Sequence, residues 1–225
     1  MSHRHANNEY DHEPIRGLPE ELPAGEEILC QVEPEWWSMA RRTFHTVQVG
    51  VYFALLIAAH QVYHYSQGGG VAEGLSSLGW QLALAAAGLG ILCGLGVLYA
   101  RTTVYTLTNR RVVLRFGVAL PMMINLPLDR IDAADLRPFG DGTGDIALRL
   151  AKGEWISYWA LWPHARPWHL SPVIPSLRSV PDAQRVAERL VAAVQARSDD
   201  VAVAPERSRD RITGGDRLTP AGAMA

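Results

Sequence analysis

Two long stretches of this 225-residue chain contain no Asp, Glu, Lys or Arg. They cover residues 43–72 and 74–100, and only Glu73 separates them. The second stretch, 27 residues long, would extend about 40 Å as a helix and so exceeds the roughly 30 Å hydrocarbon core of a bilayer. This absence of charge excludes an ordinary soluble enzyme. It predicts two transmembrane helices, over residues 43–65 and 75–100.

The chain is also poor in cysteine and in net charge. Cys30 and Cys93 are its two cysteines, too few for a disulfide framework and without metal-ligand spacing. A formal net charge of −2 provides no basic field for nucleic acid. No convergent set of titratable groups marks an active site. We therefore predict no enzyme, no catalytic residue, no metal site and no nucleic-acid partner.

Residues 1–40 are polar and acidic, and they lack the apolar core of a signal peptide. Nine acidic residues and a single basic one lie between Glu9 and Glu35. Four prolines interrupt the same region and prevent a helix of more than a few turns. The sequence predicts an acidic, mostly irregular arm on the cytoplasmic side.

Aromatic and basic residues flank the apolar runs in the order of an interfacial belt beside a positive-inside flank. The predicted membrane-surface residues are Trp36, Trp37, Arg41, Arg42 and Arg101. Because both basic flanks belong on the cytoplasmic side, we expect a two-pass membrane protein with both termini inside. Residues 66–74, rich in glycine and free of Lys and Arg, form the predicted periplasmic turn.

Small residues recur every fourth position in the second predicted helix. Ala86, Gly90 and Gly94 form one ridge, and Gly79, Ala83 and Ala87 form another. Such ridges permit close approach of a second helix. We favour the first helix of the same chain as the one that packs there, over a partner helix, and the sequence leaves both open.

After Arg101 the pattern changes to the β-branched and aromatic residues of strands. Thr102–Leu107 and Val112–Phe116 form a predicted hairpin, because Asn109 suits its tight turn. Apolar residues at helical spacing follow Pro181 and predict a helix that caps the sheet. Further strands are predicted at Met122–Leu126, Ala134–Arg137, Asp145–Leu150 and Trp155–Ala160. The fold class is thus α+β, with a two-helix transmembrane hairpin, a small barrel or bent sheet over residues 102–197, and a disordered tail over 198–225.

Several motifs resemble known families. The segment Tyr105–Gly117, continued by Ile124–Leu128, resembles the opening hairpin of bacterial PH-like domains fused to membrane helices. The segments Leu114–Leu128, Gly140–Leu148 and Leu161–Trp168 are similar to PuhB-type photosynthetic complex assembly proteins of purple bacteria. That resemblance implies a non-enzymatic scaffold or chaperone of the inner membrane. It also implies partners among reaction-centre and core light-harvesting subunits or other assembly factors, besides membrane lipids, and leaves a homo-oligomer open.

Four of the seven tryptophans lie within residues 155–168. Tryptophan and arginine are enriched at binding hot spots, although burial in the core accounts for such a cluster equally well. The predicted partner-binding residues are Trp159, Trp162, His164, Arg166 and Trp168. On the β hairpin, Arg110, Arg111 and Arg115 could face anionic headgroups or could belong to a solvated surface.

His60 and His64 lie one turn apart in the first predicted helix. An imidazole there could ligate a bacteriochlorophyll magnesium or a haem iron. Hydrogen bonding near the interface or across the helix pair is the favoured interpretation, so no cofactor is predicted. Two alternative functions follow from the sequence: a pigment or haem carrier, and a membrane-tethered PH-like binding module unrelated to photosynthesis.

Overall fold

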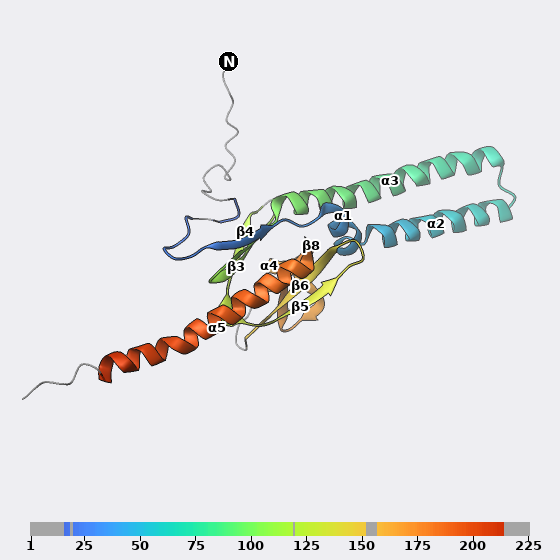
Figure 1. Cartoon of the computed structure of the whole chain (residues 1–225). Coiled ribbons are helices and arrows are strands. Elements are labelled where there is room, and N and C mark those ends of the chain that lie inside the picture. Colours follow the sequence, from blue (N-terminus) through green and yellow to red (C-terminus); the bar gives the residue numbers. More distant parts are fainter. Residues whose placement is uncertain (1–15, 19, 119, 152–156, 214–225) are drawn as a thin grey trace, which may run out of the picture.

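Two long helices project side by side from one end of a sheet-and-helix domain (Figure 1). The computed structural model describes residues 16–18, 20–118, 120–151 and 157–213. Helix α2 spans Thr46–Ser66 and helix α3 spans Val71–Thr102. Both are long and apolar enough to cross a membrane, and very little of either is buried. Because such helices need lipid around them, they indicate membrane association.

The helix boundaries differ from the predicted ones. Helix α3 begins at Val71 and not at residue 75, because Glu73 favours the first turn of a helix. Helix α2 begins at Thr46 and not at residue 43, because His45 adopts a left-handed conformation, with φ of 56°, that breaks the helix. Before this break lie a short α-helix, α1 (Trp36–Ser38), and a π-helix, η2 (Met39–Thr43).

The predicted acidic arm contains one strand that the sequence does not predict, and residues 1–15 and 19 lie outside the described part. Strand β1 (Ile28–Val32) pairs antiparallel with the next strand of the chain, β2 (Val104–Thr108). Gln31 donates a hydrogen bond to Thr106, and Thr108 donates one to the buried Glu26. The alternate threonines of β2 therefore recruit the arm, since buried hydroxyls need partners.

The first sheet has the order β1-β2-β3-β4. Strands β3 (Arg111–Phe116) and β4 (Met122–Pro127) continue it antiparallel. The predicted hairpin is confirmed, with Asn109 and Arg110 in its turn. The side chain of Asn109 fixes that turn, because it accepts a hydrogen bond from the Glu27 amide and donates one to the Gly25 carbonyl.

The second sheet has the order β5-β6-β8-β7. A 3-10 turn, η3 (Leu128–Arg130), leads into it from β4. The strand predicted at Trp155–Ala160 is wrong in its described part, because residues 158–161 form helix α4 (Tyr158–Leu161); residues 152–156 lie outside the described part. The strands of this sheet are β5 (Ile131–Pro138), β6 (Thr143–Leu150), β7 (Ala165–Leu170) and β8 (Val173–Pro181).

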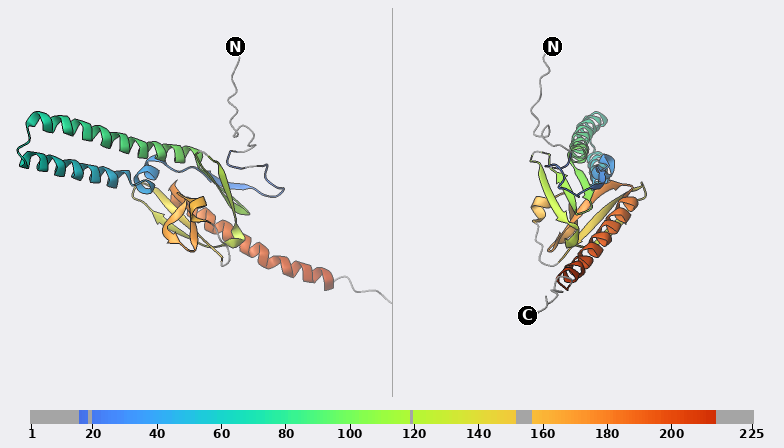
Figure 2. Two further views of the ribbon diagram at one scale, coloured as in Figure 1. Left: turned by 180° about the vertical axis from the view of Figure 1, so that it is seen from behind. Right: turned by 60° about the vertical axis from the view of Figure 1, so that its left-hand side comes forward.

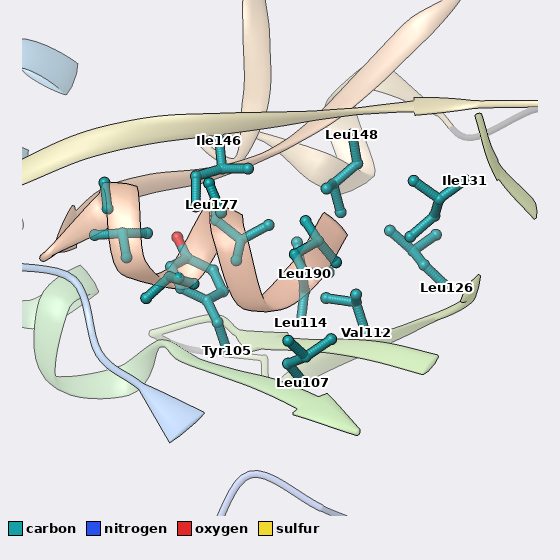
Figure 3. Close-up of a cluster of buried hydrophobic side chains, with 14 of the residues drawn as sticks. Tyr105, Leu107, Val112, Leu114, Leu126, Ile131, Ile146, Leu148, Leu177 and Leu190 are labelled. Atoms are coloured by element: carbon teal, nitrogen blue, oxygen red, sulfur yellow. The ribbon is translucent and has the colours of Figure 1, made fainter. Parts of the chain in front are cut away.

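The core lies between the two sheets and helix α5 (Ala183–Thr213), as Figure 3 shows. Tyr105 and Leu114 of the first sheet meet Ile146 and Leu177 of the second, with Leu190 of α5 beside them. Burying one such side chain stabilises the fold by roughly 1.5–3 kcal/mol. Helix α5 caps the sheets as predicted, and its buried residues are Ala183, Val186, Ala187, Leu190 and Ala193, whereas Val191 is exposed.

Helix α5 extends away from the membrane helices (Figure 2). It continues to Thr213, so the disordered tail predicted from residue 198 is wrong over its first part. No glycine interrupts residues 198–213, and Gly214 and Gly215 follow directly. Pro205, which lacks the N–H that a helix interior normally uses, lies inside this extension.

Candidate interaction surfaces

The predicted aromatic surface is not a single surface. Trp159 in α4 is 84% exposed, whereas His164 is fully buried. His164 therefore cannot contact a partner, and this part of the prediction is wrong. Trp162 lies against the membrane helices. Trp168 belongs to β7, and its side chain lies outside the described part.

Trp162 forms an aromatic cluster with Phe44 and Tyr99 where the membrane helices meet the domain. Its ring centroid lies 6.2 Å from that of Phe44, just before α2, and 6.1 Å from that of Tyr99, near the end of α3. Phe44 and Tyr99 are themselves 5.6 Å apart. Edge-to-face contacts at such distances stabilise a structure beyond their area burial. Trp162 thus joins the domain to both membrane helices.

His164 lies behind Trp162 in a buried polar network. Its Nδ1 is 2.8 Å from the Tyr105 hydroxyl, and its Nε2 is 3.4 Å from the Thr103 hydroxyl. The Tyr105 oxygen also accepts a hydrogen bond from the Arg178 amide at 3.0 Å. A neutral imidazole fits this arrangement, with Nδ1 accepting from Tyr105 and Nε2–H donating to Thr103.

Burial keeps His164 neutral. Desolvation, with a smaller contribution from the Arg178 charge, lowers the pKa of His164 from 6.5 to about 3. Desolvation also raises the pKa of the Tyr105 hydroxyl well above its ordinary value. Arg178 is itself paired with Asp145 at 3.0 Å, so its charge is compensated inside the domain. The network fixes Thr103, the residue after α3, to the core.

Arg166 contributes to a surface ion-pair group on the second sheet. Its guanidinium lies 3.4 Å from Asp135, which also accepts a hydrogen bond from Arg149 at 2.9 Å. All three side chains are about half exposed. Of the predicted partner-binding residues whose side chains are described, Trp159, Trp162 and Arg166 are therefore accessible, and Trp162 uses part of its surface in the contact with the membrane helices.

A second polar contact holds the segment before α2 on the domain. The Ser38 hydroxyl lies 2.8 Å from that of Thr143, which donates to Asp141 at 2.7 Å. Arg42 donates to the same carboxylate at 2.8 Å and lies 3.7 Å from the centroid of the Phe139 ring. Hydrogen bonds from Arg42 and Thr143 lower the pKa of Asp141 to about 2.

The small-residue ridges of α3 face away from α2. A Cβ built on Gly79, Gly90 or Gly94 would meet nothing within 4 Å, and Ala86 is exposed. The groove is therefore not filled by α2, contrary to the favoured prediction. The reason is visible at Gly88, where an added Cβ would lie 3.3 Å from Phe53 of α2. Helix α2 packs on the opposite side of α3.

The two candidate histidines of α2 both have hydrogen-bonding partners. His60 Nδ1 lies 2.8 Å from the Gln81 amide nitrogen of α3, and His64 Nε2 lies 3.2 Å from the Gly70 carbonyl. Beside His60, a lipid-facing groove is lined by Phe53, Ile57, Leu84 and other apolar residues. No group of three or more His, Cys, Asp or Glu that could hold a metal occurs in the described part of the chain.

The predicted membrane-surface residues gather where the helices enter the domain. Trp36 and Trp37 are both nearly half exposed, with ring centroids 5.6 Å apart, and Arg41 and Arg101 are exposed. Arg42 is instead engaged by Asp141.

Two of the three hairpin arginines lie at the opposite end of the first sheet. Arg110 and Arg111 lie at the β2–β3 turn. Arg115 lies at the other end of β3, where it pairs with Val104, the first residue of β2 after α3. Arg111 is paired with Glu26 at 2.8 Å. Arg110 and Arg111 thus lie at the end of the sheet farther from the membrane helices, and Arg115, at the nearer end, is buried.

A family model described as "Bacterial PH domain" matches residues 51–194. The chain belongs to this bacterial PH domain family. It is also 36% identical over 206 residues to a protein of Rhodobacter capsulatus described as "Uncharacterized 23.7 kDa protein in puhA 5'region". That similarity covers 89% of this chain and 95% of the relative. No solved structure gives a significant match.

The bacterial PH domain match begins within α2 and ends within α5. It therefore includes most of the membrane-helix pair as well as both sheets. The residues before it contribute Phe44 to the aromatic cluster and Arg42 to the Asp141 contact. Sequence reasoning missed the roles of Phe44, Tyr99 and Asp141. The one available signal was the position of Phe44 and Tyr99 near the ends of the charge-free runs.

Proposed function

We propose that this bacterial PH domain protein is a non-enzymatic assembly factor for the photosynthetic reaction centre and its core light-harvesting complex. Two findings support the proposal. Three segments are similar to PuhB-type assembly proteins, and the Rhodobacter capsulatus relative is described by its position in the puhA 5′ region. The name of the PuhB-type family and the description of the Rhodobacter capsulatus relative share the puh gene designation.

The outward small-residue face of α3 is the observation that carries the mechanism. Ala86, Gly90 and Gly94 lie open on the side away from α2. In lipid, helices associate through close backbone packing at such positions, because no hydrophobic force drives them together. In the proposed mechanism, a transmembrane helix of a client subunit packs there transiently. The PH domain lies on the cytoplasmic side, where Arg41 and Arg101 satisfy the positive-inside rule.

Deletion of the gene in its photosynthetic host tests the function. We expect loss of reaction-centre and core-antenna absorption, while the free pigment pool persists and a plasmid copy restores the complexes. Normal levels of both complexes in the deletion strain would overturn the proposal. Loss of pigment itself would point instead to pigment supply, the carrier function that the groove beside His60 would serve.

A further inference from the structure

The most exposed apolar side chains of the sheet-and-helix domain lie at one end of it. Outside α2 and α3, Leu120 and Trp159 are the most exposed large hydrophobic residues in the described part of the chain, at 79% and 84%. The others there are less than half exposed. Exposed hydrophobic residues scattered over a surface need no explanation, whereas a shared location does.

Strand register places Leu120 at the membrane end of the first sheet. Arg115 of β3 pairs with Val104, which follows α3 directly, and Phe116 pairs with Met122. Gly117, Val118 and Leu120 therefore lie beyond the start of β2, past the last residue pair of β3 and β4. The β3–β4 turn reaches toward the last turns of α3, which β3 contacts. Val118 and Met122 beside it are also exposed.

Helix α4 places Trp159 at the same end. Trp162 follows it by one helical turn, and the Trp162 ring lies 6.1 Å from that of Tyr99 near the end of α3. The exposed Trp36 and Trp37 belong to α1, which packs on α3. Apolar side chains from three separate parts of the chain thus surround the exit of the membrane helices.

The position of these side chains favours contact with the bilayer surface. Membrane-spanning helices fix where the lipid begins, and the turn and α4 lie beside the end of α3. Tryptophan prefers the headgroup level of a membrane, where its ring is apolar on one side and wet on the other. Arg41 and Arg101, exposed near the same level, match anionic headgroups.

We propose that the β3–β4 turn and helix α4 enter the lipid interface through Leu120 and Trp159. The PH domain then contacts the bilayer through one element beside each of its two sheets. It is therefore not attached to the membrane through α3 alone. Because the head is held at a fixed height, a client helix at the outward face of α3 would meet the domain at a fixed depth. The inference depends only on the two helices spanning the membrane, and not on the assembly function.

An environment-sensitive fluorophore tests this directly. In a Cys30→Ser, Cys93→Ala background, Leu120→Cys and Trp159→Cys are labelled with NBD, and the protein is placed in phosphatidylcholine and phosphatidylglycerol nanodiscs, which leave both faces open to water. Leu29→Cys is the matched control, because Leu29 is 41% exposed and β1 places it near the β2–β3 turn, at the far end of the same sheet.

We expect NBD at positions 120 and 159 to emit at shorter wavelength than at position 29 and to be quenched by spin-labelled lipids. Dithionite should reduce NBD at these two positions at least about tenfold more slowly than at position 29, as burial of a side chain of this size implies. Equal emission and equal reduction rates at the three positions would overturn the proposal. So would protection from dithionite without quenching by lipid, because another copy of the chain would then cover the site.

Discussion

The hydroxyl of Tyr105 lies 2.8 Å from Nδ1 of His164, and both side chains are almost completely inaccessible to solvent. Tyr105 belongs to β2, the first strand after the membrane helices, and His164 directly precedes β7 of the second sheet. Their contact joins the two sheets directly behind the end of α3. A neutral histidine is required there, because a charged imidazole could not accept from the tyrosine.

Acid should therefore destabilise the domain through His164. The folded pKa is about 3 and the ordinary value is 6.5, so the unfolded chain takes up the proton first as pH falls. Stability is complete above pH 6.5 and declines from there toward pH 3, by at most about 1.4 kcal/mol per pH unit. Urea unfolding followed by tryptophan fluorescence between pH 7.5 and 4.5 measures this decline. A His164→Gln variant should show a shallower decline, and identical slopes would contradict the assignment.

Trp162 should matter for stability and Trp159 should not. Trp162→Ala removes the ring that contacts Phe44 and Tyr99, and we expect a loss of about 1–2 kcal/mol. Trp159→Ala, at an 84% exposed position, should remain within about 0.5 kcal/mol of the wild type. Thermal unfolding in mild detergent compares the two variants. Equal effects would show that the aromatic cluster does not hold the domain to the helices.

Gly96 should tolerate no side chain, whereas Gly94 should accept one. A Cβ on Gly96 would lie 2.7 Å from the Ala40 Cβ and 3.0 Å from its Cα, so backbone must move. Gly96→Ala is expected to cost about 1–3 kcal/mol through overpacking. Gly94→Ala meets open space and should be neutral or slightly stabilising, because alanine favours helix over glycine. The thermal unfolding midpoints of the two variants measure this difference. A Gly96→Ala protein as stable as the wild type would contradict the packing of η2 on α3.

The open face of α3 should be needed for function but not for folding. A Gly90→Leu, Gly94→Leu variant fills the proposed client site, at two positions where an added Cβ meets nothing within 4 Å. We expect normal amounts of protein in the membrane and failure to restore reaction-centre absorption to the deletion strain. Ala58→Leu and Ala59→Leu on the exposed side of α2 form the control and should restore it. Full rescue by the α3 variant would exclude this face as the client site.

Local sequence patterns predicted the helix pair and the β2–β3 hairpin. Both depend on neighbouring residues, namely the absence of charge and the turn chemistry of Asn109. Strands β7 and β8 were not predicted, because prolines punctuate them and β8 pairs with the distant β6. The alternation of apolar and polar residues is weak in these strands. Pairing between strands far apart in the sequence cannot be predicted from a short segment.

The candidate site was harder to predict than the fold. His164 stands among tryptophan, proline and arginine, a composition that binding surfaces and cores share. Its partner Tyr105 lies 59 residues away in the chain, so spacing carries no sign of the contact. The ridge of Ala86, Gly90 and Gly94 was recognised from its period, but which neighbour it faces depends on the rotation of α3. That rotation is set by Phe53 and Gly88.

Site-specific photocrosslinking tests most directly whether the outward face of α3 holds a client helix. A photoreactive phenylalanine analogue at Ala86 in living photosynthetic cells should capture a reaction-centre or core-antenna subunit, identified by mass spectrometry. The same analogue at Leu55, which is exposed on α2, should not. Capture of neither subunit from Ala86, or equal capture from both positions, would contradict the account.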